Sequence, residues 1–189
     1  FEIAVKDAQP WTVMSSYNKI NGVYTSESKD LLTTILRDEW GYEGTVMTDW
    51  FGGKDGAAQI WAGNDMLQPG KAEQFTSIVD GVKSGRLKKA DLDRNVARIL
   101  SLIEKTPRYQ GYKYSNKPDL KAHAAVTRQS ATEGMVLLKN EANTLPIATK
   151  ASDTKVALYG CTSYDFIAGG TGSGNVNHAY VVSLLDGLK

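Results

Sequence analysis

Residues 45–53 read TVMTDWFGG, a short apolar segment that ends in an aspartate, two aromatic residues and two glycines. Val46 and Met47 have the apolar character of a buried β-strand, and Asp49 follows where the chain turns into two glycines. Parallel sheets and barrels of the α/β class build their sites at the carboxyl ends of strands. Asp49 is therefore a candidate catalytic carboxylate. Because aspartate is also a favoured N-cap and turn residue, capping of the next helix is an alternative role.

The composition indicates an ordinary globular chain. Its 189 residues carry 22 Lys and Arg against 21 Asp and Glu, and 41% are apolar. We expect no nucleic-acid partner and, since no apolar run is long enough to cross a bilayer, no membrane partner. The single cysteine, Cys161, excludes an internal disulfide. With His123 and His178 it gives no zinc spacing, so no metal and no cofactor are expected.

Strand and helix patterns alternate in the first part of the chain. Three segments have strand character, and the apolar residues around them recur at helical spacing. This β-α-β-α-β order predicts a parallel sheet with right-handed crossovers and helices on its faces. Three strands do not close a barrel of eight, so the unit is either a small open sheet or the last portion of a (β/α)8 barrel. The predicted strands are 11–17, the segment ending at Asp49, and 61–70; the predicted helices cover 28–41, 57–60, 75–82 and 92–103.

A second unit is predicted after a linker rich in tyrosine, glycine and lysine at 107–118. A helix is expected from about Asp119 toward Asn140, and residues 155–160, KVALYG, are predicted as a strand that opens another α/β domain. The glycine-rich segment 168–174 lacks both the Gly-Lys-Ser/Thr ending and the immediate helix of a phosphate loop. A flexible loop beside a neighbouring site is the favoured interpretation.

Several motifs follow one another in a recognisable order. They are MSSYN with NG (14–18, 21–22), LRDEWGYEG (36–44), VMTDW (46–50), AGNDM with PG (62–66, 69–70), SATEGMVLLKN (130–140) and LP (145–146). Their order and spacing resemble glycoside hydrolase family 3, the β-glucosidase family. The resemblance implies an α/β fold: the C-terminal portion of a (β/α)8 TIM-like barrel, a linker, and the start of an α/β sandwich domain. The implied boundaries are 1–106 for the barrel part, 107–150 for the linker and connecting helix, and 151–189 for the sandwich part.

The resemblance also implies a function and the residues that serve it. The implied activity is that of a retaining, exo-acting β-glycosidase of the β-glucosidase type, which hydrolyses terminal β-linked sugars through a covalent glycosyl-aspartate. Asp49 matches the family's nucleophile, and Trp50 matches a position that lines the sugar site. Met14 and Tyr17 match positions that wall the glycone pocket, with the Tyr17 hydroxyl near Asp49. Ser173 matches a loop position that reaches the sugar from the second domain in some relatives.

Other polar residues are expected to have supporting roles or none. Asn18, Asn21 and Asp65 are typical of the family and are expected to brace loops by satisfying backbone groups, without contacting the sugar. No glutamate has a context that suggests a catalytic acid, so ordinary solvated roles are expected for Glu27, Glu39, Glu43, Glu73 and Glu133. In the family the acid/base glutamate usually lies further along the second domain, and a lysine-histidine pair and an arginine on earlier barrel strands hold the sugar hydroxyls.

These implications set the expected partners. The substrate is expected to be an oligosaccharide or a β-glucoside, the second partner is the remainder of a longer parent chain, and the segment alone is expected to be inactive. Because many members of this family are exported, the enzyme is expected to be secreted or periplasmic. Two alternatives stay open: a non-catalytic sugar-binding or scaffold relative, and an enzyme with β-xylosidase or β-N-acetylhexosaminidase specificity.

Overall fold

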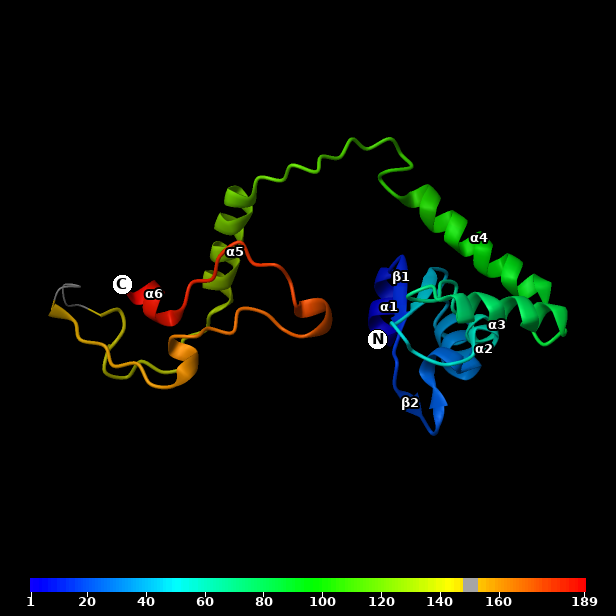
Figure 1. Cartoon of the computed structure of the whole chain (residues 1–189), viewed down its shortest axis with the longest axis horizontal. Coiled ribbons are helices and arrows are strands. Elements are labelled where there is room, and N and C mark those ends of the chain that lie inside the picture. The colour runs from blue at the N-terminus through cyan, green and yellow to red at the C-terminus, as the bar shows by residue number, and fades with distance from the viewer. Residues whose placement is uncertain (148–152) are drawn as a thin grey trace. The chain divides into compact units, whose positions relative to one another are not determined.

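The chain forms two compact units, Phe1–Pro118 and Asp119–Lys189, which are described separately (Figure 1). The computed structural model describes residues 1–147 and 153–189. The predicted boundary at 150/151 lies outside these residues, so the division into barrel part, linker and sandwich part stays a prediction. Within the described ranges, no helix is long and apolar enough to span a bilayer.

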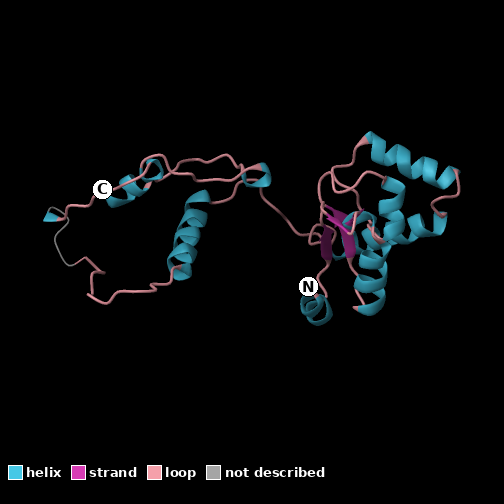
Figure 2. Ribbon diagram, turned by 90° about the horizontal axis from the view of Figure 1, so that it is seen from below, coloured by secondary structure: helices cyan, strands magenta, loops and turns pink. Residues whose placement is uncertain are grey.

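The sheet of the first unit consists of two parallel strands, β1 (Thr12–Ser15) and β4 (Thr45–Thr48), with Ser15 opposite Thr48 (Figure 2). Both strands were expected, and so was their parallel pairing. The turn predicted between them is a small antiparallel hairpin of β2 (Lys19–Ile20) and β3 (Val23–Tyr24).

The third predicted strand, 61–70, is wrong except at one point. Met66 makes a single parallel bridge to Met47, whereas Trp61 and Ala62 belong to the preceding helix. The reason lies at Val46, whose N–H donates to the Asp65 side chain at 2.8 Å. In a full third strand, a backbone carbonyl would accept this N–H. Because the Asp65 carboxylate accepts it instead, the hydrogen-bond ladder between β4 and residues 61–70 does not continue.

Helices follow the apolar stripes seen in the sequence. A helix of the π type, η2, covers most of the segment predicted from residue 28, and its end before Gly41 agrees with the predicted stop. The other three predicted helices are present, and α1 and the short η1 were not predicted. The helical elements of the first unit are α1 (Glu2–Ala8), η1 (Thr25–Glu27), η2 (Asp30–Glu39), α2 (Gly56–Ala62), α3 (Ala72–Lys83) and α4 (Lys89–Lys105).

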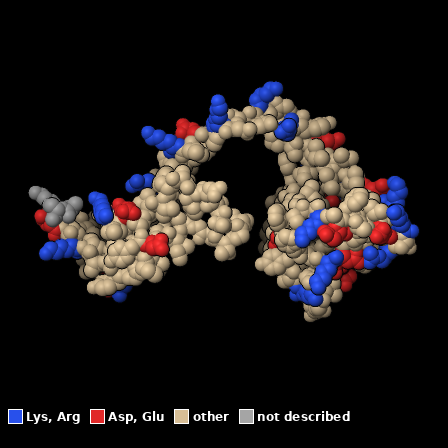
Figure 3. All heavy atoms as spheres, viewed as in Figure 1, with Lys and Arg blue, Asp and Glu red and all other residues tan. Residues whose placement is uncertain are grey.

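Two apolar clusters hold the first unit together. Strand β4 packs through the fully buried Val46 against η2 and the end of α2, while the other side of α2 packs against α3 and α4 through Leu87. On the face drawn in Figure 3, acidic and basic side chains are interspersed over this unit. The clusters are Val5, Leu32, Leu36, Tyr42, Val46 and Ala62 in the first, and Ala57, Ile60 and Leu87 in the second.

The second unit departs more from the sequence-based expectations. Helix α5 (Leu120–Gly134) begins where predicted but ends at Gly134, well before Asn140, because glycine disfavours a helix interior and Met135 takes an extended conformation. The segment 155–160 forms no strand, since no other described segment of this unit pairs with it. The other elements in the described part of this unit are η4 (Cys161–Ser163), η5 (Gly172–Gly174) and α6 (Leu184–Leu188).

Candidate functional site

Asp49 leaves the sheet at the carboxyl ends of both parallel strands, as predicted. Its backbone N–H donates to the carbonyl of Ser15 at 2.8 Å, so it is still tied to β1 when it leaves β4. The side chain is partly exposed, and its Oδ1 accepts a hydrogen bond from the N–H of Trp50 at 2.6 Å. The carboxylate is therefore fixed at its base and accessible from solvent.

The alternative role of Asp49 as a helix cap is wrong. Helix α2 is capped by Asp55, whose Oδ1 accepts the N–H groups of Ala57 at 3.0 Å and Ala58 at 3.3 Å. Asp55 also forms an ion pair with Arg86. The helix start is thus satisfied six residues beyond Asp49, whose carboxylate stays free for another function.

Trp50 and Phe51 form an aromatic pair directly after Asp49. The two ring centroids lie 6.0 Å apart with an interplanar angle of 88°, and 61% of Trp50 and 59% of Phe51 is exposed. The ammonium of Lys71 lies 4.5 Å from the centre of the Phe51 ring. An exposed indole beside a carboxylate presents an apolar face on which a sugar ring can pack.

The other predicted sugar-site residues are only partly gathered around Asp49. Tyr17 is exposed, and its Cα would lie 3.4 Å from a Cβ placed on Gly52, so its backbone runs beside the turn after Trp50. In the described ranges, the Tyr17 hydroxyl makes no hydrogen bond to Asp49. Met14 lies on β1, where it lines an apolar cavity of about 340 Å³.

Ser173 belongs to the second unit, where it lies in η5, and its side chain is exposed. The turn around it is held by the Gly170 N–H, which donates to the Gly174 carbonyl at 2.9 Å. The glycine-rich segment is thus a loop with a tight turn, and its flexibility and its place beside a neighbouring site stay predictions. Ser173 is not among the residues that the first unit brings together.

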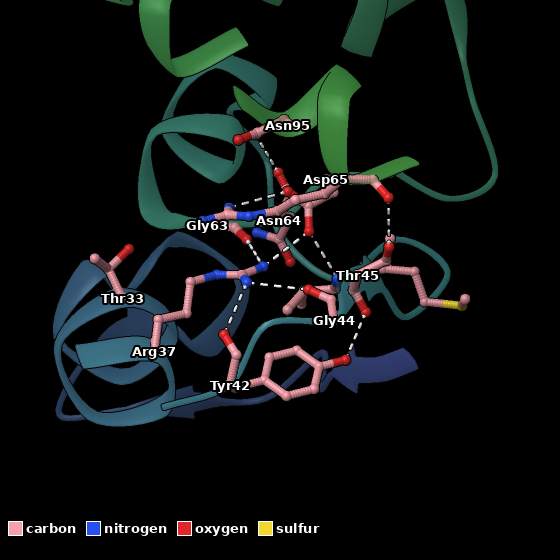
Figure 4. A network of polar contacts seen from close by, with 12 residues as sticks. Thr33, Arg37, Tyr42, Gly44, Thr45, Gly63, Asn64, Asp65 and Asn95 are labelled. Carbon is pink, nitrogen blue, oxygen red and sulfur yellow. Dashed lines mark hydrogen bonds and ion pairs between the residues drawn. The ribbon is translucent and has the colours of Figure 1, made fainter. Parts of the chain in front are cut away.

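A buried polar network lies beside the first residues of β4, around Gly44 and Val46 (Figure 4). At its centre Asp65 has a fully buried side chain that accepts from Arg37 at 2.8 Å, from Arg98 at 3.3 Å and from the Val46 N–H at 2.8 Å. Arg37 also donates to the carbonyl of Gly44 at 3.0 Å. Asp65 does satisfy a backbone group, as expected, but this group is the Val46 N–H within strand β4 and not part of a loop at the carboxyl ends of the strands.

Burial sets the electrostatics of this network. It raises the pKa of Asp65, while the Val46 amide and the guanidinium groups of Arg37 and Arg98 act to lower it. Burial also lowers the pKa of Arg37, against the attraction of Asp65. Each charge therefore depends on its partner, because an unpaired charge at this depth is costly.

Glu27 was expected to be an ordinary solvated residue, and this expectation is wrong. It is partly buried in η1, and its Oε1 accepts the backbone N–H groups of Lys54 at 2.6 Å and Asp55 at 3.0 Å. The interaction spans 27 and 28 positions of the chain, so no local pattern in the sequence indicates it.

Among the described residues, no cluster of three or more His, Cys, Asp or Glu side chains could hold a metal ion.

Comparisons with known proteins agree with this α/β arrangement. Residues 1–102 match the family described as glycosyl hydrolase family 3 N terminal domain, and residues 135–189 match the glycosyl hydrolase family 3 C-terminal domain. The parallel strand pair with its helices and the two family matches assign the chain to the glycosyl hydrolases with an α/β fold. The chain belongs to glycosyl hydrolase family 3.

The similar proteins are much longer than this chain. A beta-glucosidase from Rhizobium radiobacter is 41% identical over the whole chain, which spans 23% of that protein. An exo-alpha-(1->6)-L-arabinopyranosidase from Bifidobacterium breve is 38% identical, and the chain spans 25% of it. The structure of beta-glucosidase 3B from Thermotoga neapolitana in complex with glucose matches 99% of this chain and 27% of its own, with 44% identity and a TM-score of 0.86.

Proposed function

We propose that this chain is part of a longer retaining β-glycosidase of the β-glucosidase type, with Asp49 as its nucleophile. The observation that carries the proposal is the position of Asp49. Its carboxylate is partly exposed at the carboxyl edge of β4, has a backbone hydrogen bond from Trp50 and does not cap the helix that follows. The family membership and the beta-glucosidase relatives support the same reaction.

The proposed reaction has two steps. A carboxylate oxygen of Asp49 bonds to the anomeric carbon of a terminal β-linked sugar, while the bond from that carbon to the leaving-group oxygen breaks. The leaving oxygen takes a proton from an acid group supplied by the rest of the parent chain. Water then attacks the anomeric carbon and gives a proton back to that same group, which now acts as a base, so the glycosyl ester breaks and the carboxylate is restored. The chain alone is accordingly proposed to be inactive.

The proposal extends to the architecture of the parent protein. Residues 1–106 are proposed to complete a (β/α)8 barrel with earlier strands, and 151–189 to open an α/β sandwich after the linker at 107–150. Because one relative is an arabinopyranosidase, the terminal sugar can differ from glucose. Activity assays of the full-length polypeptide therefore include α-L-arabinopyranosides and β-xylosides. Export to the periplasm or medium is part of the proposal, and cell fractionation tests it.

The experiment follows the stereochemistry of hydrolysis by the full-length polypeptide. Proton NMR of the first-formed sugar from an aryl β-glucoside is expected to show the β-anomer, because two displacements at the anomeric carbon retain configuration. First-formed α-glucose would contradict the covalent mechanism. The absence of hydrolysis of every glycoside tested would favour the non-catalytic sugar-binding alternative.

Trp50→Ala is expected to lower kcat/KM by about 10- to 100-fold through a loosened sugar pocket. The indole is exposed, so its removal leaves no cavity in the apolar clusters and the stability is expected to change little. Trp50→Phe is the matched variant, and it retains an aromatic face and most of the activity. Steady-state kinetics on an aryl β-glucoside measure both. Kinetic constants of Trp50→Ala equal to those of the wild type would remove Trp50 from the site.

A further inference from the structure

Two buried side chains form hydrogen bonds to the turn that follows Asp49 and Trp50. The carbonyl of Gly52 accepts a hydrogen bond from Gln59 Nε2 at 2.7 Å and another from the Ser26 hydroxyl. Gln59 is only 2% exposed and Ser26 is fully buried. Backbone carbonyls in exposed turns normally bind water. Two hydrogen bonds from buried side chains to one such carbonyl are therefore a specific arrangement.

A third side chain holds the same loop one step further along. Glu27 follows Ser26 in η1, and its carboxylate accepts the N–H groups of Lys54 and Asp55. A carboxylate that accepts backbone amides forms charge-assisted hydrogen bonds, which are stronger than neutral ones. We call Ser26, Glu27 and Gln59 the loop clamp.

All three members of the loop clamp converge on Gly53. A Cβ at this position would lie 2.4 Å from Gln59 Nε2, 2.6 Å from the Ser26 hydroxyl and 2.9 Å from Glu27 Oε1. Its φ is +128°, a conformation that other residues rarely adopt. The chain at Gly53 therefore fits against the clamp without space for any side chain.

The loop clamp is itself anchored to the sheet. Asn64 donates to the carbonyl of Ser26 at 2.6 Å, and its Oδ1 accepts from the hydroxyl of Ser15 at 2.7 Å. Ser15 is the last residue of β1, the strand to which the Asp49 backbone is bonded. The clamp and the candidate nucleophile thus share one rigid support.

The residues between Asp49 and the clamp form a tight turn, in which the Gly52 N–H donates to the Asp49 carbonyl at 3.2 Å. Phe51 has a φ of +61°, which is strained for a residue other than glycine and persists only where the surroundings impose it. Its carbonyl accepts from the Gly53 N–H at 2.9 Å, so the strained residue is bonded to the point where the clamp acts. The clamp therefore holds the far end of the turn that begins at Asp49 and Trp50.

We propose that Ser26, Glu27 and Gln59 are positioning residues for glycoside hydrolysis, acting through the loop that carries Asp49 and Trp50. The inference rests on the proposed function. A displacement of about 1 Å in a reacting group can cost about 100-fold in rate. Loosening the loop is therefore expected to reduce catalysis more than substrate binding.

Glu27→Ala and Gln59→Leu in the full-length polypeptide test the proposal. Each removes hydrogen bonds to the loop, and kcat for an aryl β-glucoside, per folded molecule, is expected to fall by about 10- to 100-fold with KM changed less than about threefold. Glu27→Gln retains an acceptor oxygen and is expected to preserve most of kcat. Glu73→Ala, an exposed glutamate on α3, is the matched control and is expected to behave as the wild type.

The readouts separate positioning from a merely structural role. Circular dichroism and thermal unfolding give the folded fraction, and the rate of covalent labelling by a 2-deoxy-2-fluoro-glucoside reports the first chemical step alone. We expect Glu27→Ala to label at least about tenfold more slowly than Glu73→Ala, in proportion to its loss of kcat. Wild-type kcat per folded molecule in both clamp variants would overturn the inference, as would equal losses in Glu27→Gln and Glu27→Ala. Failure of the proposed function is a different result, an inactive wild type or an active Asp49→Asn variant.

Discussion

Replacing Asp49 with asparagine in the full-length polypeptide is expected to lower kcat for an aryl β-glucoside by about 10⁴-fold or more. The amide is nearly isosteric with the carboxylate, but it cannot form the glycosyl ester. Its oxygen can still accept the N–H of Trp50, the hydrogen bond that fixes Asp49 in the structure. The fold and the melting temperature are therefore expected to be preserved while turnover is lost.

The matched control is Asp93→Asn, which neutralises an exposed carboxylate on α4. Asp93 forms a surface pair with Lys89, at 2.7 Å. Steady-state kinetics and circular dichroism on the two variants make the comparison. If Asp49→Asn retained activity near that of Asp93→Asn, the nucleophile would have to lie elsewhere.

Replacing Asp65 with alanine is expected to reduce the free energy of unfolding by about 3–5 kcal/mol. The change leaves Arg37 buried without its carboxylate partner and leaves the Val46 N–H without an acceptor. Removal of one partner from a buried charge pair costs far more than the pair contributes, because the remaining charge is not solvated. A loss of this size is a large share of the 5–15 kcal/mol by which proteins are typically stable.

Urea unfolding measures this effect. Arg37→Met is expected to destabilise comparably, since it removes the nearer of the two guanidinium groups paired with Asp65 and leaves that of Arg98, at 3.3 Å. Asp93→Asn again serves as the control and is expected to cost at most about 1 kcal/mol, as for other exposed pairs. Equal unfolding midpoints for Asp65→Ala and Asp93→Asn would show that the network does not support β4.

The sequence predicted the elements whose information is local. The apolar residues of α4 recur at helical spacing, and those before Asp49 form a short strand pattern. Both elements are present in the structure. The third strand failed because a side chain, Asp65, takes the place of a backbone acceptor, which no periodicity reveals. In the second unit α5 was predicted too long because the apolar pattern continues past Gly134, although the helix does not.

The residues of the candidate site likewise fall into those that a local pattern indicates and those that only the folded chain brings together. The place of Asp49 at a strand end could be derived from nine consecutive residues, 45–53. The loop clamp could not, because Ser26 and Glu27 meet residues 26 to 28 positions away, and only the folded chain brings them together. Arg37 and Asp65 are likewise 28 positions apart. The side chains that hold the turn after Asp49 are thus found by structure, whereas the strand-end position of Asp49 can be found by pattern.

The most direct measurement is mass spectrometry of the full-length polypeptide after incubation with a 2-deoxy-2-fluoro-β-glucoside that has a good leaving group. Such a sugar forms the glycosyl ester faster than water can remove it, so the intermediate accumulates. The account predicts one fluoroglucosyl group per molecule, located by peptide fragmentation on Asp49. A label on any other carboxylate, or turnover of the sugar with Asp49 unmodified, would contradict it.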